Sequence, residues 1–282
     1  MAKPFRFGVV AGTAGSAAEW VARARRVEEL GYATLLIPDT SFTFAPMVAL
    51  AAAAAATTTL RVGTWVLAPT RNAVMLAHEA ATLDYLSGGR FELGLGAGRD
   101  GVEGDYRTLG VPVPSAGARV EQLALAIATV RARWLAPDMA PKPVQKPGPP
   151  IVVAGSGPRV LGLAAREADV VALGVSPMED EAAVSARLDR IRDAAGARFG
   201  QLEIAGSLLV VGDKANPYMQ KRLGTTPADL MRLGSASAIG GSLDEMCDQL
   251  RARRDRLGIS YIAAPEDVID QLAPVVERLS GR

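Results

Sequence analysis

The stretch LRVGTWVLAPTRNAVMLAHEAATLDYLSGGRFELGLGAG, residues 60–98, decides the fold. Leu60 to Leu67 is apolar with β-branched residues, Val74 to Leu86 repeats its apolar residues at helical period, and Phe91 to Ala97 is apolar again. Both apolar runs are nearly continuous, which is typical of strands buried on both faces. The stretch therefore predicts one parallel βαβ unit whose sheet is covered by helices.

The rest of the chain continues this alternation of strand and helix. Further strands are predicted over Phe5–Ala11, Thr34–Ile37, Ile151–Ala154, Asp169–Leu173, Leu202–Val211 and Ile259–Ala263. Eight such units without a reversal predict an α/β fold, a closed (β/α)8 TIM barrel, with residues 1–282 as a single domain. Residues 99–115 and 136–150 are predicted as loops, and Pro274 is expected to kink or divide the last helix.

Composition limits the classes of function. The chain has 282 residues, 49% of them hydrophobic, and 31 Lys and Arg against 30 Asp and Glu. No basic stripe stands out, so we expect neither nucleic acid nor a membrane as partner. No apolar run approaches the roughly 20 residues that span a bilayer, and no signal-peptide pattern begins the chain, so a cytoplasmic protein is expected. Cys247 is the single cysteine, which argues against a disulfide or a metal site and predicts a buried small hydrophobe.

Several motifs together resemble one known family. "RVGTWVL" followed by "EAATLDYLSGGRFELGLGAGR" is similar to the bacterial luciferase-like oxidoreductase superfamily, which shares the luciferase-like monooxygenase domain, and in particular to its coenzyme F420-dependent branch. "EELGYATLLIPDT", "DYRTLGVP" and "PPIVVAGSGPRVLGLAAREADVVALG" follow in the family's order. The resemblance covers nearly the whole chain, and it implies F420 as the coenzyme, with FMN as the alternative.

The resemblance also implies where the cofactor lies. Reactive groups of such a barrel lie at the C-terminal ends of its strands. Related deazaflavin enzymes carry a cis peptide bond in the third strand, at the position of Trp65-Val66. The implied cofactor-binding residues are Asp39, Thr64, Trp65, Val66, Gly96, Ala97, Gly98, Ala154, Gly155, Ser156 and Gly157.

Three further residues after the fourth strand, Arg99, Asp100 and Tyr106, are candidates for binding substrate or phosphate. For the two charged residues, a solvated loop is the competing interpretation.

The segment Ala154-Gly155-Ser156-Gly157-Pro158 joins a strand to a helix. Exposed N–H groups at a helix N-terminus attract phosphate, and glycine lets a ligand approach the backbone. An ordinary tight turn explains these residues equally well, and only the resemblance favours phosphate. If this loop binds phosphate, Gly155→Val is expected to weaken cofactor affinity with little loss of stability.

The predicted catalytic residues are Asp39 and Thr40. Many deazaflavin-dependent relatives have Asp-His at this place, where the histidine can act as acid or base, whereas this chain has Asp39-Thr40. Asp39 is expected to accept a hydrogen bond from a ring N–H of the cofactor, and a helix or turn cap is its competing interpretation. The only histidine, His78, is predicted to face solvent and is a poor catalytic candidate.

Three functions remain open from the sequence. The first is an F420-dependent oxidoreductase that transfers hydride between the deazaflavin and a small-molecule C=C, C=N or C=O group. The second is an FMN-dependent monooxygenase, and the third is a cofactor-binding barrel without catalysis, suggested by the missing histidine. The expected partner is a small-molecule substrate, and formation of a homodimer is left open.

Overall fold

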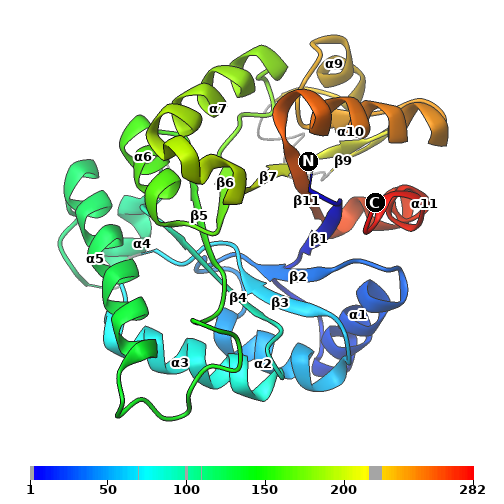
Figure 1. Cartoon of the computed structure of the whole chain (residues 1–282). Coiled ribbons are helices and arrows are strands. Elements are labelled where there is room, and N and C mark those ends of the chain that lie inside the picture. The colour runs from blue at the N-terminus through cyan, green and yellow to red at the C-terminus, as the bar shows by residue number, and fades with distance from the viewer. Residues whose placement is uncertain (1–2, 69, 99–100, 109, 216–223) are drawn as a thin grey trace.

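The computed structural model describes residues 3–68, 70–98, 101–108, 110–215 and 224–282. Its strands close into a parallel barrel in the order β1-β11-β7-β6-β5-β4-β3-β2, and helices surround it, which confirms the predicted TIM barrel (Figure 1). The barrel strands are β1 (Arg6–Val10), β2 (Thr34–Ile37), β3 (Arg61–Thr64), β4 (Phe91–Gly96), β5 (Ile151–Gly155), β6 (Val170–Leu173), β7 (Glu203–Ser207) and β11 (Ile259–Pro265).

The helices follow the strands as predicted over most of the chain. They are α1 (Ala17–Glu29), α2 (Pro46–Ala56), α3 (Ala73–Leu86), α4 (Val102–Thr108), α5 (Ala116–Leu135), α6 (Pro158–Glu167), α7 (Glu181–Ala195), α9 (Pro227–Arg232), α10 (Leu243–Leu257) and α11 (Ile269–Leu279). Short 3₁₀ turns lie at Gly196–Gln201 and Glu266–Val268. None of the helices in the described ranges is long and apolar enough to cross a bilayer.

Local signals explain where these helices begin. Ser16 caps α1 by accepting a hydrogen bond from the Glu19 backbone N–H, and Ser242 and Glu245 form a complete capping box on α10. Pro46 stands at the start of α2, where its missing N–H costs nothing. Capping and proline placement thus fix the helix starts locally.

The helix faces agree with the predicted pattern. Leu76, Ala80 and Leu83 of α3 are buried, whereas His78 is exposed, as expected. Cys247 on α10 is fully buried, and burial raises the pKa of its thiol. The apolar stripe of α3 therefore faces the barrel, and its histidine lies away from the strands.

Two expectations about elements are wrong. Residues 99–115 contain the helix α4, which is too short to show helical periodicity in sequence. The predicted strand Leu202–Val211 is two strands in tandem: β7 ends at Ser207, and β8 (Val210–Val211) joins β9 (Lys214–Ala215) and β10 (Ala238–Ile239) in a separate small sheet. The segment is mostly apolar on both sides of Ser207, so its pattern does not indicate the break.

The last helix, α11, runs through Pro274 without being divided, so division is wrong and a kink at this proline stays a prediction. Proline at this position leaves the carbonyl of Asp270 without its helical donor. Asp270 is exposed in the first turn of the helix, where water can bind that carbonyl instead. An exposed first turn therefore tolerates the proline.

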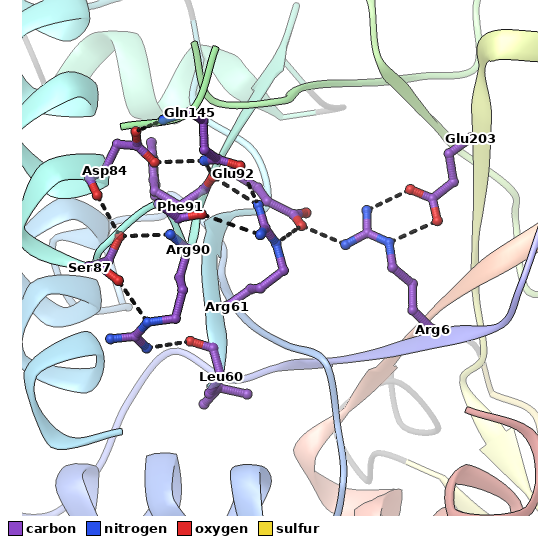
Figure 2. Close-up of polar contacts among 11 residues, drawn as sticks. Arg6, Leu60, Arg61, Asp84, Ser87, Arg90, Phe91, Glu92, Gln145 and Glu203 are labelled. Atoms are coloured by element: carbon purple, nitrogen blue, oxygen red, sulfur yellow. Dashed lines mark hydrogen bonds and ion pairs between the residues drawn. The ribbon is translucent and has the colours of Figure 1, made fainter. Parts of the chain in front are cut away.

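A buried ion-pair network closes the N-terminal end of the barrel (Figure 2). The Glu92 side chain is only 2% exposed, and its Oε1 accepts from Arg6 Nη1 at 2.5 Å and from Arg61 Nε at 2.6 Å. Arg6 also donates to both carboxylate oxygens of Glu203, at 2.8 and 2.7 Å, and its guanidinium lies 3.6 Å from the Tyr261 ring centroid. Ion pairs thus join four strands at this end, and the contact with Tyr261 adds a fifth, β11.

The charge of Glu92 depends on its two arginines. Burial raises the pKa of the Glu92 carboxyl, but the positive charges and hydrogen bonds of Arg6 and Arg61 outweigh burial and hold its pKa below the usual value. A carboxylate with a depressed folded-state pKa stabilises the fold above its unfolded pKa of about 4.3, and this stabilisation is lost as the pH falls through the folded pKa.

We therefore predict that Glu92→Gln lowers the free energy of unfolding by about 3–5 kcal/mol at pH 7, because two buried guanidinium groups lose their counter-charge. Urea unfolding at pH 7 and at decreasing pH below about 4.3 measures this. The difference from wild type should shrink with acid. Glu277→Gln, on the exposed face of α11, is the control. An equal effect of both variants would contradict the role of Glu92.

Candidate active site at the C-terminal rim

A cavity of about 690 Å³ opens at the C-terminal ends of the strands and is called the rim cavity here. Residues after β2, β3, β4, β5 and β6 line it, together with α7. The predicted residues that it brings together are Asp39, Thr40, Trp65, Val66, Gly96, Ala97, Gly98, Ala154, Gly155, Ser156 and Gly157. The location of the cavity agrees with the expectation for a barrel of this class.

A smaller hollow of about 520 Å³ lies at the opposite rim. The charged groups of Arg6 and Glu203 that line it are paired with each other. The rim cavity is both larger and richer in predicted site residues, so it is the candidate active site.

Of the predicted site residues that the structure describes, Thr64 and Tyr106 are not among those that line this cavity. The Thr64 side chain is buried, and its hydroxyl donates to Gly94 O at 2.9 Å and accepts from Gly94 N at 2.8 Å. It therefore ties β3 to β4 and is not among the residues that line the cavity. Arg99 and Asp100 lie outside the described residues, and Tyr106 is buried on α4.

Trp65 and Val66 form one wall of the rim cavity. The peptide bond between them is cis. The Trp65 backbone N–H donates to Ile37 O at 2.7 Å, and the indole meets the Tyr261 ring edge-on, with ring centroids 6.0 Å apart. The wall is thus held by β2 on one side and by the barrel core on the other.

The reason why glycine is present differs among the positions of the rim cavity. A Cβ at Gly96 would lie 2.6 Å from Val66 Cγ2, and one at Gly155 would lie 2.3 Å from Val160 Cγ1. Gly98 has a φ of 90°, which other residues rarely adopt. At these three positions glycine is required by packing or backbone conformation of the protein itself. The expectation that Gly155→Val would spare stability is therefore wrong.

Gly157 is the exception. A Cβ there would meet no heavy atom within 4 Å, and the residue is exposed beside the cavity. It is the N-cap of α6, and no side chain caps this helix. Backbone N–H groups of an uncapped first turn are available to an anion. Packing therefore does not require glycine at this position.

Asp39 makes a bidentate ion pair with Arg71, a residue that sequence reasoning missed. Arg71 Nη1 lies 2.5 Å from Asp39 Oδ2, and Nη2 lies 2.9 Å from Oδ1. The hydrogen bond to Asp39 raises the pKa of Arg71 further above its usual value. Ala45 is the N-cap of α2 and no side chain caps that helix, so Asp39 does not act as its cap. In the sequence, only the position of Arg71 after the third strand indicated that it could reach the site.

Thr40 takes part in the structure of its own loop. Its hydroxyl donates to Thr43 Oγ1 at 3.0 Å, and the Thr43 hydroxyl in turn donates to Pro38 O at 2.8 Å. This chain of bonds holds Asp39, the residue between Pro38 and Thr40, at the cavity edge. Thr40 lines the cavity, but its proton is already used within the loop.

A second ion pair, which no sequence pattern indicated, lines the side of the rim cavity next to α7. Arg187 Nη2 donates to Glu179 Oε1 at 2.5 Å, and this bond lowers the pKa of Glu179. The loop that carries Glu179 starts against the glycine segment, since Gly174 N donates to Gly155 O at 2.9 Å. Within the described residues, no three His, Cys, Asp or Glu side chains are grouped as metal ligands would be.

The comparison with known families agrees with this geometry. The family model described as luciferase-like monooxygenase matches residues 1–277. The chain belongs to this family. The resemblance of its motifs is thereby confirmed, and the protein is a luciferase-like oxidoreductase.

Two solved luciferase-like structures illustrate the fold. An F420-dependent secondary alcohol dehydrogenase in complex with an F420-acetone adduct is 17% identical, with a TM-score of 0.78 over 98% of this chain and 99% of that chain. A monooxygenase from Streptomyces bottropensis is 23% identical, with a TM-score of 0.74 over 97% of each chain. At these identities the likeness concerns the fold alone.

A further relative is similar over part of its length. The oxygenase component of flavin-dependent trigonelline monooxygenase from Acinetobacter baylyi is 34% identical over 131 residues. The match covers 42% of this chain and 36% of that protein, so it spans about a third of the relative.

The surroundings of the two glycines predict unequal stability effects within one loop of the luciferase-like barrel. Gly155→Val should lower the melting temperature by several degrees or prevent folding, because the new Cβ overlaps Val160. Gly157→Val should lower it by no more than about 2–4 °C, since its Cβ meets open space and only the preference for glycine over valine at the N-cap is lost. Thermal unfolding followed by circular dichroism measures both. Equal losses would mean that Gly157 is also required by packing.

We predict that Asp39 and Arg71 are coupled energetically. Their side chains are 19% and 33% exposed, so the coupling should be about 1–2 kcal/mol, between the limits for exposed and buried pairs. A double-mutant cycle of Asp39→Ala, Arg71→Ala and the double variant, measured by urea unfolding, gives this energy. Strictly additive single effects would show that the ion pair contributes nothing to stability.

Proposed function

We propose that the protein is an F420-dependent oxidoreductase that transfers hydride between the deazaflavin and a C=C, C=N or C=O group of a small molecule. Gly157 carries this proposal, because it leaves an uncapped helix N-terminus open beside the rim cavity. A phosphate there would accept hydrogen bonds from the first turn of α6. The Trp65-Val66 wall lines the same cavity and would support the flat ring system.

The residues of the rim cavity fit the parts of such a cofactor. Bound deazaflavin supplies the hydride chemistry, while the protein binds, orients and excludes water. Asp39 can accept a ring N–H while paired with Arg71, because two carboxylate oxygens offer about four acceptor positions and the pair uses two of them. Asp39 is therefore the proposed orienting group, held in place by Arg71.

The exposed side of the glycine loop favours F420 over FMN. The phosphate of FMN is terminal, whereas the phosphate of F420 carries a further acidic chain. Ser156, Gly157 and Arg159 are exposed, so a chain could continue from a phosphate at this place into solvent. The positive charge of Arg159 would suit an acidic chain.

An FMN-dependent monooxygenase is the second candidate function. The observation that favours it is the 34% identity with a flavin-dependent oxygenase component over 131 residues. FMN would place its phosphate at the same helix N-terminus, so the site alone does not separate the two. A barrel that binds the cofactor without catalysis is the third, and the threonine at position 40 is its only support.

A titration of oxidised F420 and of FMN against the purified protein, followed by fluorescence, tests the proposal. We expect F420 to bind more tightly than FMN. Gly157→Val should weaken F420 binding about 10-fold or more, because charge-assisted hydrogen bonds worth about 1.5–3 kcal/mol are lost. Gly200→Val is the matched control, since its Cβ also meets open space but lies in the 3₁₀ turn before β7.

Three outcomes distinguish the candidates. Tighter binding of FMN would support the monooxygenase. Unchanged F420 binding by Gly157→Val would place the phosphate elsewhere. Tight F420 binding without reduction of any enone, imine or ketone would support a binding protein.

A further inference from the structure

A second pocket of about 330 Å³ lies beside the rim cavity and is called the side pocket here. The two share Asp39, Thr40, Ala68 and Asp105, so the side pocket adjoins the place proposed for the cofactor ring. Its remaining lining residues are Ser41, Thr70, Arg71, Tyr106 and Thr108. A pocket of this size suits the reacting end of a small molecule.

Two of the residues that line the side pocket, Arg71 and Tyr106, carry hydrogen-bond donors that the protein leaves unused. Arginine has five N–H donors, and Asp39 engages one on each terminal nitrogen of Arg71, so the guanidinium has donors beyond those that hold Asp39. Tyr106 is only 3% exposed, and its hydroxyl makes no hydrogen bond within the described part of the chain. A buried hydroxyl without a partner costs about 1–3 kcal/mol, a cost that a ligand oxygen would remove.

The charges of the side pocket indicate which oxygen it accepts. The positive charge of Arg71 is already balanced by Asp39. A carboxylate ligand would therefore add an unbalanced negative charge to the side pocket, which disfavours it. A neutral carbonyl oxygen accepts from both donors without this repulsion. Negative charge that develops on this oxygen during reaction would be stabilised by Arg71.

We propose that the side pocket binds the carbonyl oxygen of a neutral hydride acceptor, an aldehyde, ketone or enone, and that Arg71 and Tyr106 donate hydrogen bonds to it. This inference rests on the proposed function, which supplies the hydride from reduced deazaflavin. When hydride bonds to the carbonyl carbon, the C=O electron pair moves to oxygen. Tyr106 then gives its hydroxyl proton to that oxygen and regains a proton from water. For an enone, hydride adds at the β-carbon and the shifted electrons place the negative charge on the same oxygen.

Tyr106 thereby acts as the general acid, a role for which the chain has no histidine at position 40. The only histidine of the chain, His78, is exposed on α3 and lies outside both pockets. The Thr40 hydroxyl donates its proton to Thr43. A tyrosine hydroxyl is a known class of general acid, and such groups contribute about 100-fold or more to rate.

The test compares Tyr106→Phe with Tyr261→Phe, whose hydroxyl is also buried but lies in the barrel interior, outside both pockets. Reduced F420 is the hydride donor, and 2-cyclohexenone, benzaldehyde and acetophenone are the acceptors. We expect Tyr106→Phe to lower turnover about 100-fold, with unchanged F420 affinity and a melting temperature equal to or above wild type. Tyr261→Phe should keep turnover within about twofold of wild type.

Binding gives a readout that does not depend on turnover. The F420-loaded protein is titrated with 2-cyclohexenone, benzaldehyde and acetophenone, and the coenzyme fluorescence is followed. Arg71→Gln should weaken binding of these ligands about 10-fold or more, and Arg71→Lys, which keeps the charge, should lose less. Benzoate should bind more weakly than benzaldehyde to the wild type.

The outcomes separate this inference from the proposed function. If the wild type does not bind F420, the proposed function fails first. If F420 binds but Tyr106→Phe turns over within twofold of wild type, Tyr106 is not the acid. If the loaded wild type neither binds nor reduces any of the three carbonyl compounds, or prefers benzoate, the side pocket is not a carbonyl subsite.

Discussion

The barrel depends on one buried charge. Glu92 lies at the N-terminal end of β4, where it is shared by arginines from β1 and β3, and Arg6 extends the network to β7. A carboxylate in this environment is favourable only while both guanidinium groups remain beside it. The network therefore fixes how these strands are placed relative to one another at one end. At the opposite end the strands lead into the loops that form the rim cavity. The sequence of these loops can vary without changing the barrel.

The fold was largely predictable because its signals are local and repeated. Continuous apolar strands, capping residues and proline at helix starts each specify one element, and eight repeats specify closure. The failures lie where a local signal is missing or ambiguous. Residues 202–211 are mostly apolar on both sides of Ser207, so the pattern does not indicate the change of sheet after this residue. The helix α4 is too short to show a period, and it carries Tyr106, a residue that the sequence singled out without showing that its hydroxyl is buried and unpartnered.

The position of the candidate site could be predicted from the sequence, but the reasons for its individual residues could not. The strand ends and the glycine loop were placed correctly by the barrel rule, and all but Thr64 of the predicted cofactor residues line the rim cavity. What sequence could not show is why each glycine is present: Gly155 and Gly96 make room for valines, whereas Gly157 leaves open space. Nor could it show that Asp39 pairs with Arg71, because the two residues are 32 positions apart and meet only when β2 and β3 lie side by side.

Cys247 is the only thiol of the chain and lies fully buried on α10, which packs against α11, β11 and α7. A reagent that modifies thiols can reach it only when α10 separates from these neighbours. The modification rate of this one side chain therefore reports the opening of the C-terminal part of the fold, without any introduced label. Measured with and without ligand, it would show whether events at the rim cavity are transmitted to α10.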